Sequence, residues 1–186
     1  MQVELKVNDK SVQAEIPEEQ LKETVLFEQL KKLGLIEDKP KTGYERVEKY
    51  SVYFFNSGGG THEVIDNKDK IDKANYDSGN YYSDCEIAKN NIRADKLLRQ
   101  LRQWQAQNDE VISKEDWEDN DKDKWCIMYG YGAEELYVNG FYSVRLHNVI
   151  YFTTKEKTKE AIEVFKDELL WYFTEYVQRL DEVQNG

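Results

Sequence analysis

The chain has two histidines, His62 and His147, and two cysteines, Cys85 and Cys126, and these side chains are the best suited to nucleophilic or metal chemistry. Their spacing supports neither use. The cysteines do not form a C-x-x-C pair and no histidine cluster accompanies them, so the usual zinc pattern is missing. Neither cysteine has a base close by in the sequence that would activate its thiol. We therefore expect two reduced thiols, as in cytosolic proteins, and no zinc centre within one subunit.

Carboxylates close to His62 leave one route to metal chemistry open. Glu63 follows this histidine, and Asp66 and Asp69 lie in the loop after it, so oxygen ligands and one imidazole are available for a divalent cation. The simpler interpretation is a solvated acidic loop, because carboxylates in loops usually face water. The alternative is a metal-dependent enzyme that acts on nucleic acid or nucleotides.

Two further motifs resemble ligand sites only in part. The glycine run 58–60 lacks the rest of a phosphate-binding loop and no helix starts directly after it, so it predicts a hairpin turn. Asp119, Asp121 and Asp123 alternate as in the first half of a calcium loop. However, Lys124 stands where that loop needs glycine and Gly130 where it needs glutamate. We predict no catalytic residue, no cofactor and no metal ligand.

The elements around these residues predict an α+β fold, with antiparallel strands and amphipathic helices packed on one face. Residues 1–36 predict a small unit of two strands around the turn 8–10 and a helix that starts at Pro17. The segment 37–46, EDKPKTGYER, is the best linker candidate because proline and glycine stand in a charged run.

The rest of the chain contains nearly the same pattern twice, about 70 residues apart. GNYYSDCEIAKNNI (79–92) and VIYFTTKEKTKEAI (149–162) each place two aromatic residues before a hydroxyl residue, and a glutamate follows three places later. This spacing predicts a short aromatic strand and a capping box, Ser83 with Glu86 and Thr153 with Glu156. We expect two strand-rich units, each ending in an amphipathic helix, over 44–107 and 124–182. A polar loop is expected over 66–80, and an acidic connection over 108–123.

Composition indicates a folded protein that repels nucleic acid on average. The 186 residues include 39% hydrophobic and 13% aromatic residues, which is too apolar for a disordered chain. The formal net charge is −11, so bare DNA and anionic membranes are poor partners and basic protein surfaces are good ones. No stretch approaches the length of a membrane span and the N-terminus lacks an apolar signal region, so we expect a cytoplasmic protein.

The acidic segment 109–123 is the first candidate binding surface. Closely spaced carboxylates imitate a phosphate strand, and a tryptophan in a polar run is typical of a binding anchor. The alternative is an acidic connecting loop. The candidate partner-binding residues are Asp109, Glu110, Glu115, Asp116, Trp117, Glu118, Asp119, Asp121 and Asp123.

The predicted helix over 87–104 is the second candidate surface, because its basic residues lie mostly opposite its apolar stripe. Arginine and lysine on such a face bind phosphate oxygens, which makes a nucleic-acid contact possible. The alternative is that these cations pair with the protein's own carboxylates or keep the helix solvated. The residues are Lys89, Arg93, Lys96, Arg99 and Arg102.

The last predicted helix, which runs to about Leu180, has a second apolar side. Val164 and Trp171 are seven residues apart and point away from the main stripe. A helix that is apolar on two sides is either enclosed between layers or used in association. Homodimer contact through these two residues is therefore one of two open interpretations.

The segments VELKVNDKSVQAEIPEEQLKE, KTGYERVEKYSVYFF, GNYYSDCEIAKNNIRADKLLRQLRQWQAQN and IYFTTKEKTKEAIEVFKDELLWYF resemble a family of small accessory proteins from prophages and mobile elements of Firmicutes. The resemblance covers nearly the whole chain and implies no catalytic residue. The family usually has a charged residue where Cys85 stands and acidic residues near Asn90, so this helix is more basic than the family pattern.

The resemblance implies a role in the cytoplasm of a bacterial host. Several acidic proteins of this setting are similar to anti-CRISPR proteins that block Cas9-type nucleases. We expect a phage-encoded, non-enzymatic inhibitor that binds such a nuclease with its guide RNA and interferes with DNA loading or cleavage. The alternative from another class is a phage regulatory or structural interaction module that forms a homo-oligomer.

Overall fold

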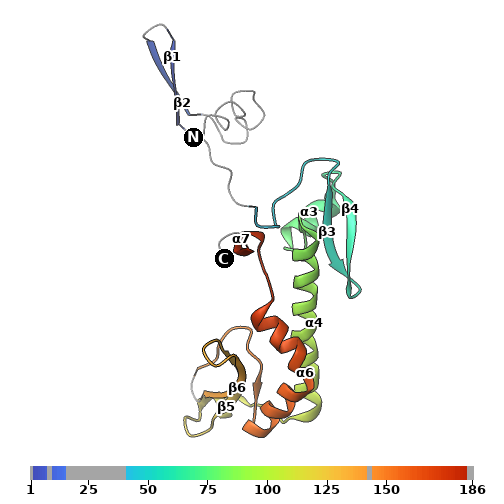
Figure 1. Ribbon diagram of the computed structural model, residues 1–186, viewed down its shortest axis with the longest axis vertical. Coiled ribbons are helices and arrows are strands. Elements are labelled where there is room, and N and C mark those ends of the chain that lie inside the picture. The colour runs from blue at the N-terminus through green and yellow to red at the C-terminus, as the bar shows by residue number, and fades with distance from the viewer. Residues whose placement is uncertain (1, 8–9, 16–40, 142–143, 184–186) are drawn as a thin grey trace. The chain divides into compact units, whose positions relative to one another are not determined.

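The computed structural model describes residues 2–7, 10–15, 41–141 and 144–183, and it has an α+β fold (Figure 1). The chain divides into two compact units, Met1–Pro40 and Lys41–Gly186. In the first unit, β1 (Gln2–Val7) and β2 (Lys10–Glu15) form the predicted antiparallel hairpin. The helix predicted to start at Pro17 and the first part of the predicted linker lie outside the described residues.

The second unit begins with a hairpin of β3 (Val52–Ser57) and β4 (Gly60–Ile65). Gly58 and Gly59 connect the strands with φ angles of 56° and 86°. Two successive positive φ angles suit the right-handed twist of a two-residue hairpin, and glycine adopts them without steric cost. The prediction of a hairpin turn at the glycine run is confirmed.

The polar loop predicted over 66–80 is wrong in part, because α3 (Lys70–Asp77) lies within it. Asp69 caps this helix: its Oδ1 accepts hydrogen bonds from the backbone N–H groups of Ile71 (2.8 Å) and Asp72 (3.0 Å). Asp72 accepts in return from the N–H of Asp69 at 3.2 Å. The signal was an Asp-x-x-Asp capping box, which is easy to miss because glutamate or glutamine usually fills the second position.

The second sheet has three antiparallel strands in the order β6-β5-β7, namely β6 (Glu135–Phe141), β5 (Lys124–Gly130) and β7 (Tyr151–Phe152). The segment just before β7, residues 144–150, is not in a strand. Asn148 has a φ of 58° there, which interrupts extended backbone.

The two halves of this unit repeat one arrangement. In each half, the first strand of a hairpin pairs on its other edge with an aromatic dipeptide that leads into a helix. Phe54 exchanges backbone hydrogen bonds of 2.8 and 2.9 Å with Tyr82, and Trp125 pairs with Phe152. Each half thus has the same order of hairpin, aromatic dipeptide and helix, with α3 as an addition to the first.

The first aromatic dipeptide leads into α4 (Cys85–Asn108), and the second leads into α6 (Lys155–Thr174). The short helices α5 (Lys114–Glu118) and α7 (Leu180–Val183) follow α4 and α6 in the chain. The capping boxes predicted at Ser83 and Thr153 are wrong by one residue. Asp84 caps α4, accepting from the N–H groups of Glu86 and Ile87, and Thr154 caps α6. The predicted final helix ends earlier than Leu180, and it has a non-helical residue at Phe165.

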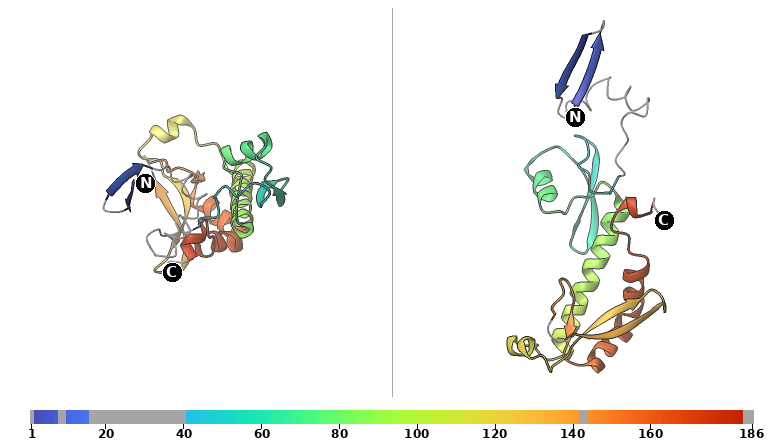
Figure 2. Two further views of the ribbon diagram at one scale, coloured as in Figure 1. Left: turned by 90° about the horizontal axis from the view of Figure 1, so that it is seen from above. Right: turned by 90° about the vertical axis from the view of Figure 1, so that its left-hand side faces the viewer.

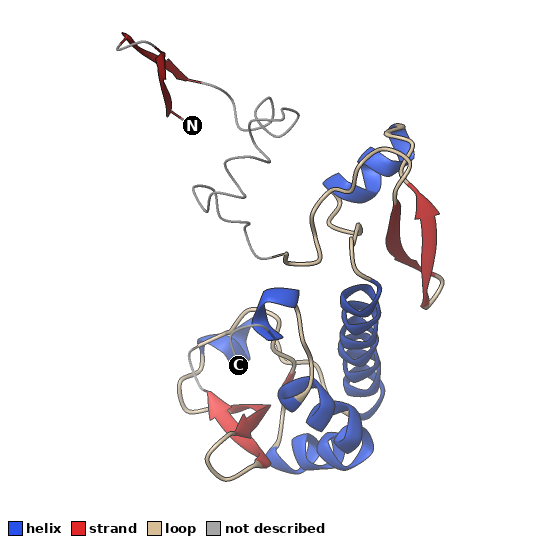
Figure 3. Ribbon diagram, turned by 45° about the horizontal axis from the view of Figure 1, so that its top comes forward, coloured by secondary structure: helices blue, strands red, loops and turns tan. Residues whose placement is uncertain are grey.

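The core has two parts, and α4 contributes to both. Near its N-terminus, Ile87 and Ala88 are buried against Tyr82, with Phe54 beside them. Further along, Leu97 and Leu101 are buried with residues of β7 and α6, and partly buried side chains of β5 and β6 pack against them. Figures 2 and 3 show α4 extending from the β3–β4 hairpin to the second sheet, with α6 alongside.

Replacing Asp84 by alanine tests the corrected cap of α4. The variant loses two hydrogen bonds to helix N–H groups, so we expect the free energy of unfolding to fall by about 1 kcal/mol. Glu86→Ala serves as control and should change it by only a few tenths of a kcal/mol, because Glu86 is exposed and, among the described residues, its side chain pairs with Lys89 alone (2.6 Å). Urea denaturation followed by circular dichroism measures both. A larger loss for Glu86→Ala than for Asp84→Ala would favour the capping box predicted from Ser83 and Glu86.

Candidate partner-binding surfaces

The acidic segment 109–123 is folded around α5. Ser113 caps α5 by accepting from the N–H of Asp116 at 3.0 Å, and Asp116 accepts from the N–H of Ser113 at 2.8 Å. The second oxygen of Asp116 binds the ammonium group of Lys122 at 2.5 Å. This hydrogen bond, with the one from Ser113, lowers the pKa of Asp116. Asp116 is therefore committed to holding the segment together, and this carboxylate contributes little to a free binding surface.

Trp117 fixes α5 to the rest of the unit. Its half-buried ring meets the buried Tyr151 edge-on, with 5.0 Å between ring centroids. The cationic groups of Lys124 and Arg145 lie 5.6 and 5.4 Å from the centroid of the indole. The prediction made Trp117 a partner anchor, whereas in the structure much of the ring is occupied by intramolecular contacts. The sequence did not predict that Trp117 anchors α5 to the rest of the unit.

Asp109 is also occupied by an intramolecular contact. Its two carboxylate oxygens accept hydrogen bonds from the backbone N–H (2.8 Å) and the hydroxyl group of Thr153. Ser83, the equivalent residue of the first half, donates to Glu45 at 3.1 Å. Each helix start is thus tied to an upstream carboxylate, and this explains why both sequence repeats keep a hydroxyl residue there.

The remaining candidates of the acidic segment have exposed side chains. Of these, Glu118 is within 3.4 Å of Lys114, an exposed pair that contributes little to stability. The six exposed residues, which we call the outer carboxylates, are Glu110, Glu115, Glu118, Asp119, Asp121 and Asp123.

The basic residues of α4 differ in how free they are. Arg93 binds both oxygens of Glu168 on α6, at 2.9 and 3.1 Å, and its guanidinium lies 3.9 Å from the ring centroid of Trp171. Lys89 pairs with Glu86, and Arg99 lies 4.0 Å from Asp95. For Lys96 and Arg102 no ion pair is formed with any described residue. The alternative interpretation, pairing with the protein's own carboxylates, thus holds for three of the five.

Of the two interpretations left open for Trp171, its burial favours enclosure over homodimer contact. The side chain is only 7% exposed, because it lies beneath Arg93 and beside Tyr176, whose ring centroid is 5.5 Å away. Val164 is 59% exposed, so it alone of the proposed oligomer contacts is available at the surface. Homodimer contact at Val164 stays a prediction.

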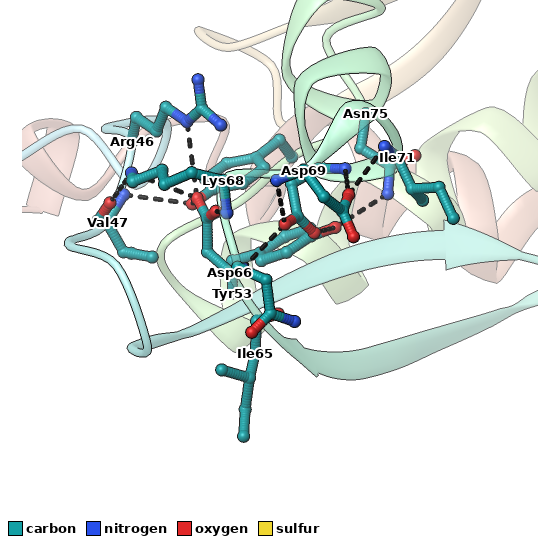
Figure 4. Close-up of polar contacts among 12 residues, drawn as sticks. Arg46, Val47, Tyr53, Ile65, Asp66, Lys68, Asp69, Ile71 and Asn75 are labelled. Atoms are coloured by element: carbon teal, nitrogen blue, oxygen red, sulfur yellow. Dashed lines mark hydrogen bonds and ion pairs between the residues drawn. The ribbon is translucent and has the colours of Figure 1, made fainter.

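The carboxylate predicted to lie in a wet loop after β4 is fully buried. Asp66 has no exposed surface and accepts from the hydroxyl of Tyr81 at 2.8 Å and from the N–H of Lys68 at 2.6 Å. The side chains of Lys68 and Arg46 lie 3.3 and 3.4 Å away (Figure 4). Burial raises the pKa of Asp66, but the hydrogen bonds from Tyr81 and Lys68 outweigh it and lower the pKa from 3.8 to about 2.

A second buried carboxylate, Asp72, completes this cluster. It accepts from the hydroxyl group of Tyr53 at 3.0 Å, and the ring of Tyr53 stacks on Tyr81 with centroids 4.0 Å apart. Asn75 donates to the same Tyr53 hydroxyl at 2.9 Å. Among the described residues no buried side-chain polar atom is left without a partner. The cluster is therefore a closed network that connects α3, β3 and the aromatic dipeptide.

The residues considered for metal binding do not converge. His62 contacts the carbonyl oxygen of Ser57 at 3.0 Å and the ring of Phe55, while Asp69 caps α3. Over the described part of the chain, no three histidine, cysteine, aspartate or glutamate side chains are grouped as metal ligands. Cys85 and Cys126 are both free thiols, and burial raises the pKa of Cys126 to about 11.

Comparison with known proteins adds no assignment: no family model, curated protein or solved structure matches the chain. The resemblance to prophage accessory proteins therefore stays a prediction. None of the described helices combines the length and apolar character needed to cross a lipid bilayer.

Asp66 predicts a specific loss of stability in acid. Because its folded-state pKa is depressed, charged Asp66 stabilises the fold above pH about 4, and this contribution of about 2 kcal/mol disappears as pH falls from 4 to 2. Asp66→Asn should be less stable at pH 7 and should lose less stability over that interval. Urea titrations at several pH values measure this. Glu63→Gln, which removes an exposed carboxylate on β4, is the control. Equal acid profiles for wild type and Asp66→Asn would contradict the assignment.

Arg93 is predicted to act as a clamp between α4 and α6. Arg93→Ala removes the contacts to Glu168 and Trp171, so we expect a loss of about 1 kcal/mol, a value reduced because the ion pair is partly exposed. Arg99→Ala, at the same helix, should change stability by less than about 0.5 kcal/mol. Thermal and urea unfolding compare the two. If Arg93→Ala and Arg99→Ala are equally stable, Arg93 is not a clamp and its guanidinium is available for a contact at the surface.

Proposed function

We propose that the protein is a non-enzymatic binding protein that docks its outer carboxylates on the basic surface of a nucleic-acid-handling protein. The most concrete partner is a Cas9-type nuclease, and the consequence is interference with DNA loading or cleavage during phage infection. The observation that supports the proposal is that α5 is held in a fixed position. A capping box and the contact of Trp117 with Tyr151 hold this short acidic helix in place.

An acidic helix with a fixed backbone is better suited to binding than a flexible acidic loop. Carboxylates on a fixed backbone lose less conformational entropy when a partner binds, which leaves more of the electrostatic attraction as affinity. The sign of the charge is complementary to channels that hold guide RNA and target DNA. The net charge of −11 adds long-range attraction to such a surface and speeds the encounter at low salt.

Direct binding of nucleic acid is the weaker component of the proposal. Arg93 is engaged by Glu168, and the exposed Lys89 and Arg99 have carboxylates beside them. Lys96 and Arg102 remain for a contact with guide RNA or exposed DNA. Two cations supply only a small part of the phosphate contacts of a typical nucleic-acid-binding protein. We therefore expect any such contact to form within the protein complex.

Charge reversal of four outer carboxylates tests the proposal. Glu110, Glu115, Glu118 and Asp121 have exposed side chains that accept no backbone hydrogen bond, so lysine at these positions should leave the fold intact. Binding to a guide-loaded Cas9-type nuclease should weaken by about tenfold or more, mainly through a slower association rate. Biolayer interferometry gives both rate constants, and nuclease assays report inhibition.

The matched control reverses four exposed acidic residues elsewhere, Glu48, Glu63, Glu163 and Asp167. It changes the net charge by the same amount, so it separates a localised surface from general attraction. If both quadruple variants lose affinity equally, the acidic segment is not the docking surface. If neither wild type nor variants shift the nuclease in size-exclusion chromatography with light scattering, a nuclease partner of this type is excluded.

A further inference from the structure

An apolar cavity lies between the central helices and the second sheet. Its volume is about 240 Å³, and it is enclosed by α4, α6, β5 and the residues just before β7. Most of its lining is apolar, and the side chains that line it include Leu98, Leu101, Ile127, Met128, Leu169 and Tyr172. By comparison, a dry cavity of about 150 Å³ in a protein core binds benzene, so this one accommodates about ten non-hydrogen atoms.

A basic hollow adjoins the cavity. It has a volume of about 440 Å³ and shares His147, Asn148 and Val149 with the cavity, while Arg102, Arg145 and Leu146 form the rest of its lining. Both arginines are exposed, and within the described residues neither has a carboxylate at ion-pair distance. In a protein with an excess of eleven negative charges, two unpaired guanidinium groups beside one cavity are an unexpected concentration of positive charge.

We propose that the cavity and the hollow form one binding site for a small amphipathic organic anion, with an aromatic or aliphatic body in the cavity and a carboxylate between Arg102 and Arg145. The apolar lining provides the free energy of burial, and the guanidinium groups hold the carboxylate through charge-assisted hydrogen bonds. A few polar groups at the opening of an apolar pocket are the usual arrangement of small-molecule sites. This site does not depend on the outer carboxylates or on a nuclease partner.

The chemistry of the lining excludes other classes of ligand. A sugar or a nucleotide base has polar edges all around it, and most of the cavity lining is aliphatic or aromatic and cannot satisfy them. A free inorganic anion would use only the hollow and leave the cavity empty. An uncharged hydrocarbon would fill the cavity but gain nothing from the arginines. Only a molecule with both parts uses the whole site.

Two probes of nearly identical shape test the proposal with the full chain. Sodium 2-naphthoate has an aromatic body that matches the cavity and a carboxylate, whereas 2-naphthamide replaces the carboxylate by a neutral amide. We expect naphthoate to bind with a Kd of about 1 mM or tighter, and naphthamide about fivefold more weakly. Ligand-observed NMR and isothermal titration calorimetry measure both. Equal affinities, or no saturable binding of naphthoate up to about 5 mM, would overturn the proposal.

Matched variants locate the two parts of the site. Arg102→Glu should weaken naphthoate binding by about fivefold, while Arg99→Glu, the same change one turn earlier on α4 and outside the site, should have less than a twofold effect. Leu98→Trp or Met128→Phe fills the cavity and should reduce binding of both probes, with circular dichroism confirming the fold. The proposal is wrong if both filled variants bind naphthoate like the wild type, or if Arg99→Glu and Arg102→Glu are equivalent.

Discussion

The burial of one face of α4 against two separate small sheets is the constraint on which the second unit depends. A two-stranded hairpin in water is marginally stable at best, and a three-stranded sheet needs a helix or a second layer to bury its apolar face. Ile87 and Ala88 cover the first sheet, and Leu97 and Leu101 cover the second. Because the same 24-residue helix serves both, the repeated halves cannot separate without exposing apolar surface.

The carboxylates of this acidic protein fall into two groups, those that make intramolecular contacts and those that are exposed to solvent. One group is internal: Asp66 and Asp72 join α3 to the first sheet, Asp109 ties α4 to the start of α6, and Glu168 holds Arg93. These contacts fix the geometry of the two halves. The other group, represented by the outer carboxylates, is exposed and contributes to the net charge while adding little to the stability of the fold. The composition gives the total number of carboxylates but does not show which are engaged in the fold and which are exposed. The net charge of −11 therefore indicates a binding surface only once the fold shows where the exposed carboxylates lie.

Local sequence patterns predicted the secondary structure well where one hydrophobic periodicity or one turn motif determines it. The glycine run 58–60 predicted a hairpin turn, and the apolar stripe from Ile87 to Trp104 predicted α4. The failures lie where tertiary contacts decide. The hydroxyl of Ser83 is used by Glu45, so the adjacent Asp84 becomes the cap, and periodicity has no means to tell these neighbours apart. For Trp171 the choice between enclosure and association stayed open, because the sequence does not show that Arg93 lies 3.9 Å from its ring. Asp66 was expected in water because its partners, Tyr81 and Arg46, are 15 and 20 residues away.

The two candidate sites meet at one residue. Arg145 lines the basic hollow, and its guanidinium also lies 5.4 Å from the ring centroid of Trp117, which mounts α5. Any change at Arg145 therefore alters both the small-molecule site and the support of the acidic segment. Arg102 contributes to the hollow from α4 and has no ring contact with Trp117 in the described structure. For this reason effects at Arg102 report on the hollow alone, whereas charge changes confined to the outer carboxylates report on α5. The fold thus allows the two hypotheses to fail independently.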